Sequence, residues 1–205
     1  MKKINLISLF LLVTSIFSFS DSREFAFITN QESNKLDVID LVTKNKIKEI
    51  NLGNRPAAIY IDKESSRIYV SNPESNNVSI IDLINKTNSL IDVGSSPLGI
   101  AVNPKKNNLF VSNWYDNIVT VVDLKTEEII KKISVGNSPA GIYIDNKINR
   151  LFVANRESNN ISVIDSKDLN TIIDIKVEKA PFGIYSEDYL SYIVVTNVQS
   201  NSISI

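Results

Sequence analysis

A repeat of about 42 residues constrains the fold of this chain more than any other feature. An asparagine closes an apolar stretch once per unit, at intervals of 42, 41, 42 and 42 residues. Columns of aspartate and proline keep register with it, and together they place a single-residue deletion between Asp82 and Gly94. A period of this length is typical of proteins that repeat one structural unit. The columns are Asn30, Asn72, Asn113, Asn155 and Asn197; Asp40, Asp82, Asp123 and Asp165; and Pro56, Pro97, Pro139 and Pro181.

Each unit contains four short apolar stretches separated by polar turn residues, which predicts strands. In the unit that begins at Pro97 they span residues 98–102, 109–113, 118–123 and 128–135, and are named a, b, c and d. Strand c alternates apolar and polar side chains, as a strand with two different faces does. Four antiparallel strands per unit, repeated radially, form the blade of a β-propeller. We therefore expect an all-β propeller of four-stranded antiparallel blades, with about four and a half repeats.

The strand inventory predicts an incomplete ring. After residue 20 the chain opens with strands b, c and d and finishes with a, b and part of c, which makes four a, five b, five c and four d strands. Ile205 occupies the column of Val163, before the last apolar residue and the aspartate of strand c. We therefore expect residues 21–205 to form a single propeller domain that is truncated at its C-terminus.

The end of strand b and the start of strand a carry a family resemblance. The four residues that end strand b read FITN (27–30), YVSN (69–72), FVSN (110–113), FVAN (152–155) and VVTN (194–197). Residues 97–102 read PLGIAV, and residues 161–165 read ISVID. These motifs resemble the YVTN β-propeller repeats of the YncE-like group, over nearly everything from Phe25 onward. The resemblance implies the fold but no single function, because propellers serve as enzymes, cofactor holders and binding scaffolds.

Composition excludes several kinds of chemistry. The chain has no histidine and no cysteine, so it has no disulfide, no thiolate or imidazole zinc site, no cysteine nucleophile and no histidine-dependent triad. Lysine and arginine (22) nearly balance aspartate and glutamate (23), without the basic stripe of a nucleic-acid-binding protein. We expect no nucleic-acid partner, no metal site, no catalytic residue and no resident cofactor. A hard cation bound by aspartate and asparagine oxygens is the alternative that composition leaves open.

The first twenty residues have the pattern of a signal peptide. Lys2 and Lys3 precede an apolar run from Leu6 to Phe17, and small residues flank Phe19 just before Asp21. The run is short for a membrane span, which needs roughly 20 residues. We expect residues 1–20 to be removed, leaving a periplasmic or extracellular protein with no membrane span.

Most recurring polar residues have a structural interpretation. The asparagines that end strand b, and those four residues later from Asn34 to Asn201, suit turns, and the aspartates that end strand c suit capping of the next turn. Ala58, Gly99, Gly141 and Gly183 suit an innermost strand with little room for side chains.

Residues that differ between blades are better candidates for a site. The turn between b and c reads WYD at 114–116, where other units carry QES, PES, RES and VQS. The turn before strand a carries Arg55 or Lys179, where GSSP (94–97) and GNSP (136–139) have serine or asparagine. Successive strands run antiparallel, so both kinds of turn fall at one end of the blade. The candidate ligand-binding residues are Arg55, Trp114, Tyr115, Arg156 and Lys179. The alternative for Trp114 is packing on a neighbouring blade.

These observations favour an exported propeller that acts as a binding or interaction module. Its partner would be a protein, a glycan or a small anionic ligand, because arginine and lysine pair with carboxylates and other anions. The resemblance leaves open a propeller enzyme of the lactonase or quinone-cofactor kind, and an inactive truncated gene product is a third alternative. No pair of carboxylates recommends itself as acid and base, which disfavours the enzyme.

Overall fold

The computed structural model describes residues 24–186 and 191–205, which form strands joined by tight turns. The predicted signal peptide lies outside the described residues. Contacts divide the described part into two units, one with residues 24–28 and 36–50 and one with residues 29–35 and 51–205. The first three strands of the chain, β1, β2 and β3, form a sheet in that order, in which Leu36 and Val38 are buried. Their bounds are Phe25–Asn30, Lys35–Asp40 and Lys46–Asn51.

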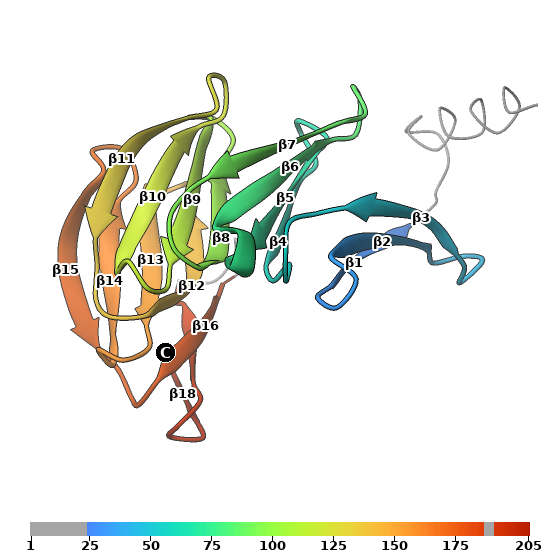
Figure 1. Ribbon diagram of the computed structural model, residues 1–205. Coiled ribbons are helices and arrows are strands. Elements are labelled where there is room, and N and C mark those ends of the chain that lie inside the picture. Colours follow the sequence, from blue (N-terminus) through green and yellow to red (C-terminus); the bar gives the residue numbers. More distant parts are fainter. Residues whose placement is uncertain (1–23, 187–190) are drawn as a thin grey trace, which may run out of the picture. The chain divides into compact units, whose positions relative to one another are not determined.

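The second unit contains three four-stranded sheets and one three-stranded sheet, all with antiparallel neighbours (Figure 1). Each sheet takes its strands in chain order, so its first strand and its last strand are edges. The strands are β4 (Ile59–Asp62), β5 (Arg67–Asn72), β6 (Asn77–Asp82) and β7 (Thr87–Asp92); β8 (Pro97–Asn103), β9 (Asn108–Asn113), β10 (Ile118–Asp123) and β11 (Glu128–Ser134); β12 (Pro139–Asp145), β13 (Arg150–Asn155), β14 (Asn160–Asp165) and β15 (Asn170–Lys176); and β16 (Pro181–Tyr185), β17 (Val194–Asn197) and β18 (Ser202–Ser204). A 3₁₀ turn, η1 (Pro73–Ser75), joins β5 to β6.

These sheets confirm the predicted fold class. The described strands include four of type a, five of type b, five of type c and four of type d, as the repeat predicted. The first sheet has no a strand and the last has no d strand among the described residues. This inventory agrees with an incomplete ring.

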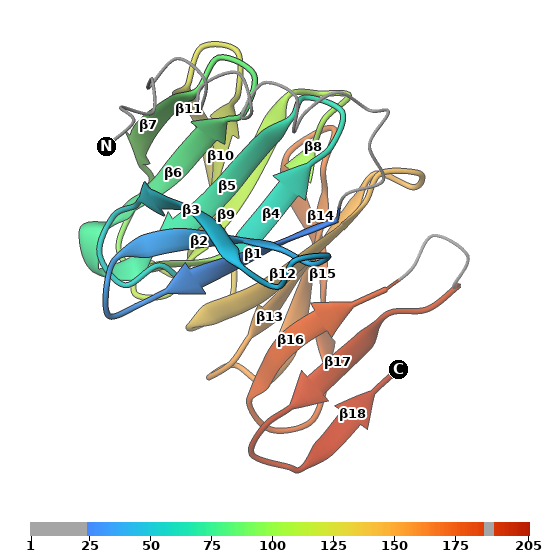
Figure 2. The same cartoon turned by 90° about the vertical axis from the view of Figure 1, so that its right-hand side faces the viewer.

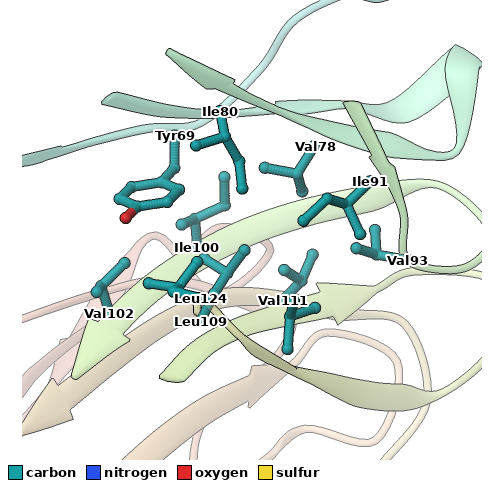
Figure 3. Packing of buried hydrophobic residues seen from close by; sticks show 11 residues of the cluster. Tyr69, Val78, Ile80, Ile91, Val93, Ile100, Val102, Leu109, Val111 and Leu124 are labelled. Carbon is teal, nitrogen blue, oxygen red and sulfur yellow. The ribbon is translucent and has the colours of Figure 1, made fainter. Parts of the chain in front are cut away.

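The core lies between neighbouring sheets of the second unit. Tyr69 and Ile80 point toward Ile100 and Leu109 of the next sheet, in a cluster of eleven buried residues (Figure 3). Strands b and c of the three four-stranded sheets are mostly buried, whereas their outermost strands are mostly exposed, and β15 is exposed at every residue. Lys131 and Lys132 lie in the outermost strand β11, where charge protects a free edge from pairing with another chain.

The single-residue deletion lies in an outermost strand. β11 and β15 have seven residues, and each pairs with its neighbour through a register shift, at Val121/Val122 and Val163/Ile164. β7 has six residues and pairs with β6 without a shift. The deleted residue is therefore the extra residue of a β-bulge, which an outermost strand can lose without disturbing the other strands of the sheet.

The aspartates that end strand c cap the following turn, as predicted. Asp82 Oδ1 accepts hydrogen bonds from the amides of Ile84 (3.0 Å) and Asn85 (2.8 Å). The equivalent bonds form at Asp40, Asp123 and Asp165. These carboxylates are engaged in fixing turns.

The asparagines that end strand b differ from the prediction. Asn30 does bind its turn, because its Oδ1 accepts from the amide of Ser33 (3.2 Å). Asn72 is buried instead, and its Nδ2 donates to Asn77 Oδ1 and Ser79 Oγ of β6, both at 2.9 Å. Asn113, Asn155 and Asn197 likewise donate to a hydroxyl of the next strand. Asparagine at this column therefore joins strand b to strand c inside the blade.

Candidate functional site

The turns from b to c and from d to the next a lie together at one end of the blades, as predicted. We name this end the turn face; in the second unit it comprises residues 30–35, 52–56, 72–77, 93–97, 113–118, 135–139, 155–160, 177–181 and 197–202. Ser75 Oγ accepts from the amide of Asn54 (2.6 Å), which holds the turn before β4 against the turn after β5. The equivalent acceptor in the next blade is Asp116, which binds the amide of Ser95 (2.7 Å).

A second hydrogen bond on the turn face links each blade to the next. Asn117 has a left-handed backbone (φ 56°), and its Oδ1 accepts from the amide of Ser138 (2.9 Å), at the start of the following blade. Equivalent bonds run from the amides of Arg55, Ser96 and Ala180 to Asn34, Asn76 and Asn159. These asparagines therefore fix the position of the turns that carry the candidate residues.

A groove of about 610 Å³ opens on the turn face. Arg55 and Tyr115 line it, and Tyr115 is 73% exposed. Arg55 forms an ion pair with Glu74 (Nε to Oε1, 3.2 Å) in which both side chains are more than half exposed. The remaining lining residues are polar apart from one proline: Gln31, Pro73, Asn76, Ser95 and Ser96.

Trp114 and Arg156 form a separate pair. The Arg156 guanidinium carbon lies 5.8 Å from the centroid of the Trp114 ring, a cation–π contact between neighbouring blades. The backbone amide of Trp114 donates to the carbonyl of Ser96, and the backbone amide of Arg156 donates to the carbonyl of Ser138. Trp114 is half-buried, so part of its surface packs within the protein and part stays accessible.

Lys179 is exposed on the turn face, in the turn between β15 and β16. Its amide donates to Ser200 Oγ (2.7 Å). All five candidate residues thus lie on one face, but only Arg55 and Tyr115 line the groove. Sequence reasoning missed Glu74. A glutamate recurs at this column as Glu32 and Glu157, so no difference between blades marked it.

The opposite face carries a smaller cavity of about 240 Å³. Its polar groups are largely engaged: Asp62 caps its own turn through the amides of Glu64 and Ser65, and Arg67 pairs with Asp82 (3.3 Å). Burial raises the pKa of the Tyr69 hydroxyl, against the opposing effect of Arg67.

Residues 24–186 and 191–205 contain no group of three or more acidic, histidine or cysteine side chains that could hold a metal ion. Over the same residues, no helix has the length and apolar character needed to cross a membrane.

Comparison with known proteins identifies the class. The sheets and their order define a β-propeller, and a family model described as YncE-like beta-propeller matches residues 16–192. The chain belongs to this YncE-like β-propeller family.

Two solved structures are similar in fold. Kuenenia stuttgartiensis hydrazine synthase shares 24% sequence identity with a TM-score of 0.73, over 84% of this chain and 52% of that one. The dihydro-heme d1 dehydrogenase NirN, in complex with DHE, shares 16% identity with a TM-score of 0.67, over 83% of this chain and 40% of that one. The chain thus spans about half the length of the first structure and less of the second. A comparison with curated protein sequences gives no match.

Proposed function

We propose that this protein is an exported propeller that acts as a binding or interaction module, with its ligand in the groove on the turn face. The observation that carries the proposal is the groove itself, because Arg55 and Tyr115 stand in its lining at columns where other blades carry different residues. A structural requirement of the blade would recur in every blade.

The chemistry of the groove indicates a polar ligand with an anionic or carboxylate group. Arg55 offers a planar set of donors, and Tyr115 offers an exposed ring and hydroxyl. An anionic group would compete with Glu74 for Arg55, because that ion pair is exposed and an exposed pair is worth only about 0–1 kcal/mol. A protein side chain, an acidic glycan or a small carboxylate would each meet this requirement.

The test is to screen the purified protein against arrayed acidic and neutral glycans and acidic peptides, and then to measure variants by calorimetry. We expect Arg55→Ala and Tyr115→Ala each to weaken binding by about tenfold or more, as hot-spot residues do. Lys105→Ala, an exposed change on the opposite face, is the matched control. A loss as large in Lys105→Ala as in Arg55→Ala would place the ligand elsewhere.

Export is part of the proposal and rests on the sequence of residues 1–20. Mass spectrometry of the protein from its native host should find a chain that begins at Asp21 in the periplasmic or extracellular fraction. A chain that begins at Met1 in the cytosol would contradict it.

The alternative is a propeller enzyme of the lactonase or quinone-cofactor kind. Both similar structures are enzymes by name, but at 24% and 16% identity their likeness carries the fold alone. A quinone or metal that copurifies with the protein in stoichiometric amount would favour the enzyme over the module.

A further inference from the structure

The last sheet, β16–β18, presents an apolar face that its equivalents in earlier blades keep buried. In the sheet β8–β11, Val119 and Val121 contact the following blade and are 0% exposed. Two repeats later the same columns hold Ile203 and Ile205, which are 59% and 78% exposed. We name the side of a blade that faces the next blade along the chain the following face. The other side of β17 is covered, since Val195 is 2% exposed.

A hydroxyl group on this face lacks the partner that its equivalents have. Ser112 Oγ accepts from the amide of Gly99 (2.8 Å) and donates to the carbonyl of Ala140 (2.6 Å), in the innermost strand of the next blade. Ser71 and Thr29 donate to the next blade in the same way. Thr196 bonds only within its own blade: it accepts from the amide of Gly183 (2.9 Å), and its hydroxyl donates at the long distance of 3.5 Å to the carbonyl of the same residue.

An acceptor on the turn face of the same sheet is also unused. Asn201 has the left-handed backbone of its column (φ 52°). Asn117 and Asn159 use this conformation to bind the amide that precedes the proline of the next strand a. Within the described part of the chain, no hydrogen bond engages the side chain of Asn201.

The innermost strand leaves room for a neighbour. A Cβ at Gly141 would overlap the carbonyl oxygen of Phe182 in the next blade, so glycine permits that close approach. At Gly183 the equivalent Cβ would meet only Thr196 Oγ1 of its own blade, at 3.0 Å. The sheet β16–β18 therefore keeps the space, the donor, the acceptor and the apolar residues of a blade-to-blade interface.

We propose that the following face of β16–β18 is a docking surface for a polypeptide segment that carries a strand d and then a strand a of this repeat. The strand d pairs with β18, which lies at the free edge of its sheet (Figure 2). The strand a has the sequence x-Pro-x-Gly; its amide before the proline binds Asn201, and its carbonyl after the proline binds Thr196. This surface is distinct from the groove, and the inference does not depend on the proposed function.

A second copy of this chain does not meet these requirements. The amides that precede all four described a strands already bind the preceding blade, through Asn34, Asn76, Asn117 and Asn159. The sheet β1–β3 of a second copy includes no a strand. The occupant is therefore a polypeptide segment with a free strand a, which none of the described strands supplies.

The probe is a synthetic peptide that copies residues 122–144 of this chain, which supply strand d and strand a in the register that continues from Ile205. A peptide that copies residues 122–135 supplies strand d alone and is the matched control. We expect the longer peptide to bind the full chain in calorimetry and the shorter one to bind at least tenfold more weakly.

Protein variants test the contacts. Asn201→Gly keeps a residue suited to positive φ and removes the acceptor, so it should weaken binding of the longer peptide about five- to tenfold, the effect of one hydrogen bond. Ile203→Asp should weaken it more than tenfold, whereas Ile172→Asp, on the outermost strand β15, should leave it unchanged. Thermal unfolding midpoints establish that each variant is folded.

Three results would overturn the proposal. Failure of the longer peptide to bind at about 1 mM would mean that the face accepts no such segment. If the shorter peptide bound as tightly as the longer one, or if Asn201→Gly bound the longer peptide as tightly as the parent chain does, the site would amount only to strand pairing at the edge of β18. Sedimentation as a dimer that Ile203→Asp dissociates would identify a second copy as the occupant.

Discussion

Substitution of Gly99 by alanine tests the tight contact between innermost strands. A Cβ at Gly99 would overlap the carbonyl oxygen of Ala140 and lie 2.9 Å from both Ile142 Cγ2 and Ser112 Oγ. Overfilling a packed interior costs about 1–3 kcal/mol, whereas alanine at a compatible backbone returns about 0.4–1 kcal/mol by restricting the unfolded chain. Gly99→Ala should therefore lower the free energy of unfolding by about 1–2 kcal/mol.

Gly183→Ala is the matched control, because the same column there faces only Thr196 Oγ1 at 3.0 Å. Its free energy of unfolding should stay within about 0.5 kcal/mol of the parent chain. Urea unfolding, followed by the fluorescence of Trp114, the only tryptophan, measures the free energy of unfolding of both variants. This free energy falls by about 2 kcal/mol per molar urea, so the expected loss in Gly99→Ala corresponds to a shift of the unfolding midpoint by about 0.5–1 M. Equal destabilisation in the two variants would refute the close-approach explanation.

Three further changes test the blade itself. Burial opposes ionisation of Asp82, but hydrogen bonds, led by those of Asn85, outweigh it and hold the carboxyl pKa below its ordinary value of 3.8. The ionised carboxylate therefore stabilises the fold above about pH 4, and this contribution is lost as the pH falls below that value. Asp82→Asn should flatten the acid side of a plot of thermal midpoint against pH. Phe110→Ala should cost about 3–5 kcal/mol in urea unfolding, because Phe110 is 0% exposed, and a cost below 1 kcal/mol would contradict its place in the core. Asn117→Ala should cost about 1–2 kcal/mol, since it leaves the amide of Ser138 without its acceptor and puts alanine at positive φ; an unchanged midpoint would show that this bond between blades contributes nothing.

Sequence periodicity predicted the fold well because a repeat multiplies every local signal. Five copies of strand b and four copies of the proline column fixed strand order and the number of strands of each type. Interval counting placed the deletion between Asp82 and Gly94, the stretch in which the structure has the outermost strand β7. The same reasoning could not show that the lost residue is a bulge residue. Bulges change pairing between strands, and pairing leaves no periodic mark on the sequence.

The long-range hydrogen bonds were not predictable, because a local explanation was already sufficient. Asparagine at Asn117 suits a left-handed turn residue, so nothing in the sequence required its side chain to bind Ser138. The buried role of Asn72 escaped for the same reason.

The candidate site was predictable only in part. Differences between blades selected Arg55 and Tyr115, which the structure places in one groove. They could not select Glu74, which matches its column and gains its position from an ion pair with Arg55. Differences between blades also could not show that Trp114 and Arg156 contact each other and do not line the groove.

The bond from Asn117 to the amide of Ser138 joins residues 21 positions apart, half of the repeat. One unit of 42 residues therefore encodes both an acceptor for the next unit and an amide for the previous one. A gene duplication that copies any whole unit, wherever its boundaries fall, supplies both halves of the bond at once. A whole unit that is gained or lost therefore leaves this bond complete at the new junction.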